Sequence, residues 1–192
     1  MTHLVTALSA LSLEPAHLEK LNQFSALFLQ WNQRINLSAA RSAEDVASHI
    51  RDSLHVVPHL RNSSRVIDVG SGGGFPVIAA AICLPALSFT ALEPVHKKHA
   101  FLRTAARELA LPNLTPLAAR VEAHAVHDYD AATSRATFDL REWLLLGAQL
   151  VRPGGIVIGF EATLRDDLPQ PLERHPYSLD GKQRSIVIHR RP

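Results

Sequence analysis

Residues 65–76 have the sequence RVIDVGSGGGFP, in which an apolar run and an acidic residue lead into a glycine-rich turn. The apolar run predicts a buried strand. A turn this tight needs residues that tolerate positive φ and leave no Cβ in the way of a ligand, and Gly70, Gly72 and Gly74 meet that need. The stretch therefore predicts a nucleotide-cofactor loop directly after a strand.

The glycine spacing separates two kinds of cofactor loop. A dinucleotide loop has the pattern G-x-G-x-x-G, but the sixth position is Phe75 when counted from Gly70 and Val77 when counted from Gly72. The observed G-x-G-x-G after an acid resembles the S-adenosylmethionine (SAM) loop of class I methyltransferases, in which the next strand ends in an acid for the ribose. Glu93 follows the next apolar run, roughly 20 residues past the loop, at the offset expected for that acid. A purely structural turn, with Glu93 as an ordinary strand-end acid, is the alternative.

The residues before this loop predict helices. Pro15 suits a first helical turn, and apolar residues then recur at steps of three and four as far as Ile35, which predicts an amphipathic helix. Ser42 can cap a second helix together with Asp45, and we expect that helix to run to about Pro58. The sequence thus predicts a helical extension over 1–61 and an α/β core over 62–192, within a single domain.

The core alternates between strand-like and helix-like segments. Apolar runs occur at 65–69, 87–92, 114–117, 131–134 and 156–160, with a Pro-Gly-Gly turn at 153–155 before the last of them. Asp180-Gly181 is a strong hairpin signal between 175–179 and 183–189. We therefore expect a mostly parallel, Rossmann-like sheet with helices on both faces and an antiparallel hairpin at one edge, as in class I SAM-dependent methyltransferases. Ligands of such sheets bind beyond the carboxyl ends of the strands.

Composition limits the class of protein. The chain has 192 residues, 46% hydrophobic and 20% charged, which suits one domain with a sizeable core. Its one cysteine, Cys83, has no disulfide partner, which favours a reducing compartment. No signal-peptide pattern and no bilayer-length apolar run are present, so we expect a cytoplasmic monomer and no membrane partner. The histidines are scattered, so no metal site is predicted.

The charge balance permits an RNA partner without demonstrating one. The net charge is +2 with histidine neutral, and the sequence pI is about 9.0. Lys97, Lys98, Arg103 and Arg107 fall within one predicted helix, and the last two share a face. A solvated surface helix explains the same residues equally well.

Motifs along nearly the whole chain resemble the RsmG (GidB) family of bacterial small-subunit rRNA methyltransferases. They are the glycine loop ending in Phe75-Pro76, Trp31-Asn32 with 35–37, His49 with 52–54, Lys98 with 101–102, 120–122, Ser134-Arg135-Ala136, and 184–188. The resemblance implies transfer of a methyl group from SAM to N7 of a guanine in 16S rRNA. It also implies 16S rRNA or the 30S subunit as the partner.

The same resemblance implies roles for individual residues. The turn of Gly70, Gly72 and Gly74 with Phe75 would contact the methionine end of SAM, and Glu93 would contact the ribose. Residues Val121 and Glu122 would contact the adenine, and Arg135 would bind the cofactor with substrate contact as a second role. Their residue types suit these tasks, because carboxylates accept hydrogen bonds from hydroxyl and amino groups. A surface helix-cap acid is the alternative for Glu122.

No catalytic base is predicted. Guanine N7 carries a lone pair and no proton, so catalysis would come from alignment of the base with the methyl group. His49 and Asp52 lie three apart on a helix, which favours packing over acid–base work. If Arg135 touches the base, it should bond O6 or a phosphate, because N7 must stay free.

Two positions depart from the family pattern. The family usually has glycine where this chain has Val77, and a valine there could crowd the ligand. The family usually has a lysine near the end of the fifth strand, whereas this chain has Glu161, whose charge would repel phosphate. A methyltransferase acting on a small molecule or another nucleic acid, and a non-enzymatic SAM- or ribosome-binding protein, therefore stay open as alternatives.

Overall fold

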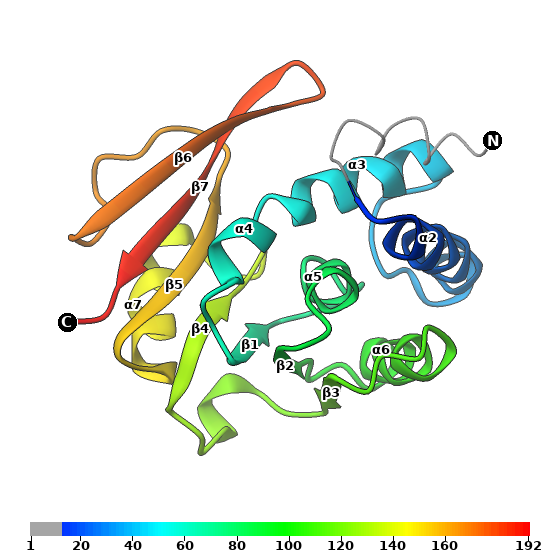
Figure 1. The fold of residues 1–192 in the computed structure, drawn as a ribbon, viewed down its shortest axis with the longest axis horizontal. Helices are drawn as coiled ribbons and strands as arrows, with labels where there is room; N and C mark the ends of the chain where they lie inside the picture. The colour runs from blue at the N-terminus through cyan, green and yellow to red at the C-terminus, as the bar shows by residue number, and fades with distance from the viewer. Residues whose placement is uncertain (1–12) are drawn as a thin grey trace.

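A seven-stranded sheet of order β3-β2-β1-β4-β5-β7-β6 organises the computed structural model, which describes residues 13–192 (Figure 1). The strands are β1 (Arg65–Val69), β2 (Ser88–Leu92), β3 (Leu114–Leu117), β4 (Tyr129–Thr133), β5 (Val151–Glu161), β6 (Leu172–Leu179) and β7 (Lys182–Arg190). The helices are α2 (Pro15–Ile35), α3 (Ala43–Leu54), α4 (Val57–Leu60), α5 (Val77–Cys83), α6 (His96–Glu108), the 3₁₀ turn η2 (Val121–Ala123) and α7 (Leu140–Leu150).

The direction of the strands confirms the predicted topology. Strands β1 to β5 pair in parallel, whereas β7 pairs antiparallel with both β5 and β6. Asp180 and Gly181 adopt φ of +50° and +75° in the tight turn between β6 and β7, as an Asp-Gly hairpin requires. The carboxyl ends of β1, β2, β4 and β5 consequently meet at one edge of the sheet.

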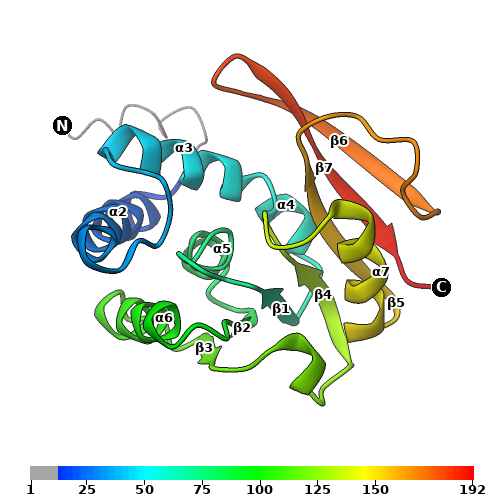
Figure 2. The ribbon, with the colours of Figure 1, turned by 180° about the vertical axis from the view of Figure 1, so that it is seen from behind.

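Helices cover both faces of the sheet. Figures 1 and 2 show α2, α3, α5 and α6 gathered on one face and α7 packed against β5 on the other. Aromatic rings pack between the helices on the first of these faces. The ring centroid of Phe28 lies 5.2 Å from that of Phe75 and 6.0 Å from that of Phe101. Trp31 packs on Phe101 at 5.7 Å, which agrees with a packing role. Within 13–192, no helix is both long enough and apolar enough to span a bilayer.

The predicted second helix is correct at its start and wrong at its end. The Ser42 hydroxyl accepts from the Asp45 N–H at 3.1 Å, and the Asp45 carboxylate accepts from the Ser42 N–H at 3.0 Å, which forms a capping box. The helix α3 ends at Leu54, not near Pro58. A proline lacks the N–H that continues a helix but suits a first turn, so Pro58 lies in the first turn of the separate helix α4, which begins at Val57.

Three strands begin earlier than predicted. Strand β4 begins at Tyr129, β5 begins at Val151, before the Pro-Gly-Gly segment, and β6 begins at Leu172. Tyr129 already pairs with Val151, and the register shifts before Ala131 pairs with Ile156. Gly154, at φ +75°, absorbs this irregularity inside the strand, so the expected turn is a bulge.

Candidate functional site

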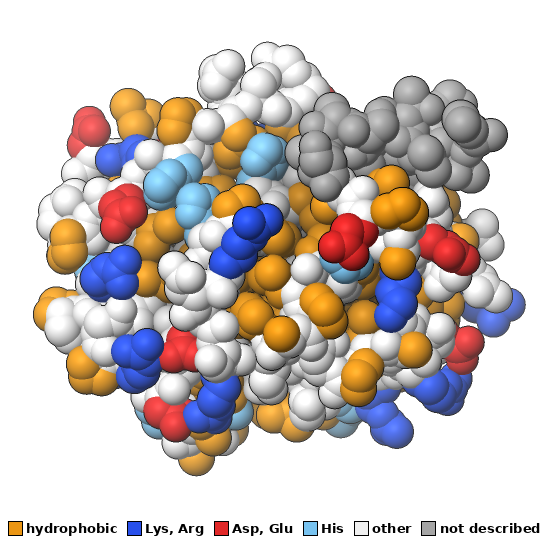
Figure 3. Space-filling view, in the orientation of Figure 1, with side chains coloured by type: hydrophobic (Ala, Val, Ile, Leu, Met, Phe, Trp, Pro, Cys, Tyr) orange, Lys and Arg blue, Asp and Glu red, His pale blue; other side chains and the backbone are white. Residues whose placement is uncertain are grey.

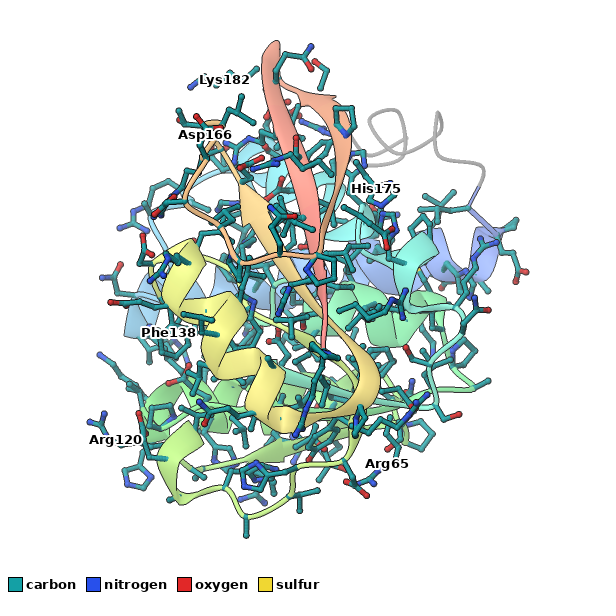
Figure 4. The ribbon with its side chains drawn as sticks, turned by 90° about the vertical axis from the view of Figure 1, so that its left-hand side faces the viewer. Arg65, Arg120, Phe138, Asp166, His175 and Lys182 are labelled. Atoms are coloured by element: carbon teal, nitrogen blue, oxygen red, sulfur yellow. The ribbon has the colours of Figure 1, made fainter. Side chains whose placement is uncertain are left out.

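A cavity of about 650 Å³ opens at the carboxyl edge of the sheet. Its walls are the glycine turn after β1, the loop of residues 134–138 after β4, the end of β5, helix α3 and the C-terminal hairpin. Figure 4 shows two of these boundaries, with Phe138 beside α7 and Lys182 at the tip of the hairpin. This strand-end cavity lies where a ligand of a class I sheet is expected.

The glycine turn forms one wall of the strand-end cavity. Gly70 and Gly72 line it, with φ of +72° and +52°, in the left-handed region that side chains disfavour. A Cβ on Gly70 would overlap the side chain of Thr137, whose hydroxyl donates to the Gly70 carbonyl at 3.2 Å. The loop after β4 is therefore closed onto the turn, and only glycine permits that approach.

Glu93 lies beneath the turn and is buried. Its Oε2 accepts from the Gly72 N–H at 2.8 Å, and its Oε1 accepts from the Val95 N–H at 2.8 Å. Each carboxylate oxygen has a second lone pair. The carboxylate thus fixes the turn from behind, because Glu93 itself does not line the strand-end cavity, and its ribose role stays a prediction.

Gly74 and Val77 do not line the strand-end cavity. A Cβ on Gly74 would overlap the side chain of Ile78, so this glycine permits the start of α5. The side chain of Val77 is buried in the hydrophobic core, in the first turn of α5. The expected crowding of a ligand by Val77 is therefore wrong, because that side chain points into the core.

Val121 and Glu122 lie apart from this cavity's lining. They form the 3₁₀ turn η2, in which Val121 is buried and Glu122 is exposed. The adenine roles of both residues stay predictions.

Asp68 is fully buried at the end of β1, two residues before Gly70. Burial raises its pKa to about 6, although hydrogen bonding to Ser71 and Thr133 acts in the opposite direction. Its Oδ1 accepts from the Thr133 hydroxyl at 2.6 Å, whereas Oδ2 has no partner within 13–192. Asp68 does not line the strand-end cavity, so this oxygen lies behind the glycine turn and not on the cavity surface.

Arg135 lines the strand-end cavity from the loop after β4. Its Nη1 donates to Asp52 Oδ2 at 2.9 Å, and its guanidinium lies 5.1 Å from the Phe75 ring centroid and 6.0 Å from that of Phe160. The side chains of Arg135 and Asp52 are only 15% and 6% exposed, so the pair is shielded from water. The structure thereby brings the predicted Arg135 together with Gly70, Gly72 and Phe75.

His49 lines the strand-end cavity from α3, with its ring 5.3 Å from Phe75. Burial and the charge of Arg135 lower its pKa, against the opposing charge of Asp52. The imidazole is therefore neutral at neutral pH and adds no positive charge beside Arg135.

Glu161 does not face the strand-end cavity. It is buried and pairs with Arg174 on the hairpin, with Nε to Oε2 at 3.0 Å, and it accepts from the Arg165 N–H at 3.0 Å. The expected repulsion of phosphate is therefore wrong, since the carboxylate is neutralised inside the protein.

The sequence alone predicts no role for Thr137. It indicates Arg184 only as part of the motif 184–188 that resembles the family. Thr137 follows the Ser134-Arg135-Ala136 motif directly, and that adjacency was its signal in the sequence. Arg184 lines the strand-end cavity from β7, with a buried Nε that has no partner in the described part of the chain.

The residues present fit SAM. The glycine turn offers backbone without Cβ atoms at the cavity wall, and the Glu93 carboxylate can accept from hydroxyl groups. SAM carries ribose hydroxyls, which are donors of that kind.

Comparison with known proteins supports the same assignment. A family model named GidB and described as rRNA small subunit methyltransferase G matches residues 17–189. A ribosomal RNA small subunit methyltransferase G from Aromatoleum aromaticum is 37% identical, over 93% of this chain and 92% of that protein. The protein of that name from Chromobacterium violaceum is 43% identical, over 76% of this chain and 71% of its own length.

Solved structures show the same fold at low sequence identity. The S-adenosylmethionine-dependent methyltransferase SibL in its apo form matches 98% of this chain and 73% of its own, with a TM-score of 0.63 and 18% identity. A precorrin-6y C5,15-methyltransferase from Geobacter metallireducens matches 80% of this chain and 91% of its own, with a TM-score of 0.56 and 16% identity.

Proposed function

Because this chain belongs to the rRNA small subunit methyltransferase G (GidB) family and is a SAM-dependent rRNA methyltransferase, we propose that it methylates N7 of one guanine in 16S rRNA. The 30S subunit or its 16S rRNA is the proposed partner, and the cytoplasm, where ribosomal subunits are found, is the proposed location. We also propose that the protein acts as a monomer.

The observation that carries this proposal is one cavity lined by both the glycine turn and Arg135. SAM supplies a methyl group bound to a positively charged sulfur. Gly70 and Gly72 would present backbone groups to its methionine end, and Glu93, held by Gly72 at 2.8 Å, would accept from the ribose. Glu122 would accept from the adenine amino group beside Val121.

The guanine would occupy the part of the strand-end cavity between Arg135, His49 and the hairpin. Since N7 has a lone pair and no proton, the residues around it need only hold the base in line. The pairing of Arg135 with Asp52 offsets the guanidinium charge, and the lowered pKa of His49 keeps that ring neutral. Both features limit repulsion of the positive charge that methylation places on guanine.

Basic side chains suit contact with the RNA backbone. Lys98 lines the strand-end cavity from α6, and Lys97 and Arg103 are exposed on the same helix. Figure 3 shows Lys and Arg side chains over the region that α6 occupies in Figure 1. Such residues would bind phosphates and orient the subunit without reading sequence.

A transfer assay tests the proposal. Purified protein, methyl-labelled SAM and 30S subunits from a strain that lacks the gene would be incubated, and the 16S rRNA digested to nucleosides. We expect the label in 7-methylguanosine, with the wild type and with the Arg61→Lys control, which changes an exposed arginine. Label in a different nucleoside, or SAM binding without transfer to subunits or naked 16S rRNA, would refute it.

A further inference from the structure

Both carboxylate oxygens of Asp52 are occupied by residues from distant parts of the chain. Oδ2 accepts from Arg135 Nη1 at 2.9 Å, and Oδ1 accepts from the Tyr177 hydroxyl at 2.7 Å. Asp52 is 4% exposed. A buried carboxylate keeps its orientation only while its hydrogen-bond partners are present, so the two contacts depend on one another.

Tyr177 belongs to β6 and does not line the strand-end cavity. Its ring stacks on His55 at 3.9 Å between centroids, and this stacking fixes where its hydroxyl points. Burial, together with the neighbouring Asp52 charge, raises the pKa of the Tyr177 hydroxyl far above its usual range, so it stays a donor at every working pH. One hydrogen bond thus links β6 to Asp52, which lines the strand-end cavity.

Arg135 needs such support because it extends from a loop. The following residue, Ala136, has φ +57°, which is unfavourable for a residue with a Cβ. Among the described residues, Asp52 is the one hydrogen-bond acceptor of the Arg135 guanidinium, while Phe75 and Phe160 lie near its faces. A guanidinium has five N–H donors, so others are left for a ligand.

We propose that Tyr177 is a positioning residue for methyl transfer: its hydroxyl orients Asp52, which holds the Arg135 guanidinium in the strand-end cavity. This rests on the proposed function, because it is Arg135 that would meet the reacting base or the cofactor. The C-terminal hairpin is then part of the site as well as an edge of the sheet.

The two tyrosines of the chain provide a matched pair of variants. Tyr177→Phe removes the donor to Asp52 and keeps the ring that stacks on His55. Tyr129→Phe removes a hydroxyl that donates to Thr90 at 3.3 Å and contacts His124, outside the cavity lining. Each variant loses one oxygen from a partly shielded hydroxyl, so a difference between them reports the Asp52 contact.

Steady-state kinetics with 30S subunits is the first test. We expect Tyr177→Phe to lower kcat by about tenfold, because the loss of one hydrogen bond to a charged group has an effect of that size. The KM for SAM and the melting temperature should be close to those of Tyr129→Phe. In an Arg135→Lys background, the same change should have little further effect. An unchanged kcat, or equal losses in both tyrosine variants, would overturn the proposal.

A measurement on the free protein separates this proposal from the proposed function. The Arg135 side-chain N–H signals, assigned by their loss in Arg135→Lys, would be followed by ¹⁵N NMR without SAM or RNA. We expect them to shift or broaden in Tyr177→Phe and to stay in place in Tyr129→Phe. Unmoved signals in Tyr177→Phe would overturn the proposal that Tyr177 positions Arg135 through Asp52. An absence of rRNA methylation by the wild type would refute only the proposed function.

Discussion

The amide of Gly72 donates to Glu93 Oε2 over 2.8 Å, so the glycine turn and the acid that ends the next strand form one unit. Parallel pairing of β1 with β2 places them side by side, with Val69 opposite Leu92. The carboxylate that fixes the turn is the one that we propose for the ribose.

Glu93→Gln should weaken SAM binding by about tenfold to a hundredfold. The amide replaces an acceptor oxygen with a donor, so it loses either the contact to Gly72 or Val95 or the ligand hydroxyl. Calorimetric titration with SAM measures this, and Glu108→Gln on the exposed face of α6 is the control. Equal affinities for the two variants would remove Glu93 from the cofactor site.

Arg135→Ala should abolish methyl transfer and also reduce the free energy of unfolding by about 3 kcal/mol, because Asp52 is left as a buried, uncompensated charge. Adding Asp52→Asn should restore much of that stability without restoring transfer. Denaturant unfolding and the 30S assay measure the two effects separately. Normal turnover by Arg135→Ala would exclude this arginine from the site, and an unchanged stability would show that the pair has no structural role.

Glu161→Lys should destabilise the protein by about 3 kcal/mol or more, although it introduces the residue type usual in the family. The new ammonium would be buried against Arg174, which now neutralises the carboxylate. The exposed Glu173→Lys is a control on the same hairpin. Thermal melting compares the two variants, and tighter RNA binding by a stable Glu161→Lys protein would contradict our interpretation of Glu161.

Acid should loosen the contact between the hairpin and the helices. Histidines gather where α4 meets β6, with His59 4.3 Å from His175 (Figure 3). Burial lowers the pKa of His59 below its ordinary 6.5, and burial likewise lowers that of His55. As the pH falls, the unfolded chain therefore takes up protons before the folded protein does. The stability contributed by the neutral, buried His59 is present above pH 6.5 and is lost as the pH falls towards the folded-state pKa.

Denaturant unfolding at about pH 7.5 and about pH 5.5 checks the sign. His59→Gln should lose less stability between these two pH values than the wild type, and His96→Gln, which changes an exposed residue, should behave as the wild type does. A larger acid loss in His59→Gln than in the wild type would contradict the assignment.

The alternation of apolar runs was sufficient to predict the sheet, because strand and helix periodicities are local properties. The glycine turn was predictable for the same reason, since positive φ and close approach demand glycine where they occur. Ion pairs between residues far apart in the sequence were not predictable. Asp52 and Arg135 are 83 positions apart, and Arg174, the partner of the buried Glu161, belongs to another strand. No local pattern reports which charges will meet inside a fold, so the sequence alone predicts an exposed, repulsive Glu161.

The most direct test of the methyl-transfer account is chemical cleavage of 16S rRNA at 7-methylguanosine, in cells with the gene deleted and in the same cells with the gene restored. We predict that one cleavage site disappears on deletion, returns with the wild-type gene and stays absent with Arg135→Ala. Identical cleavage patterns with and without the gene, from cells in which the protein is shown to be present, would contradict the account.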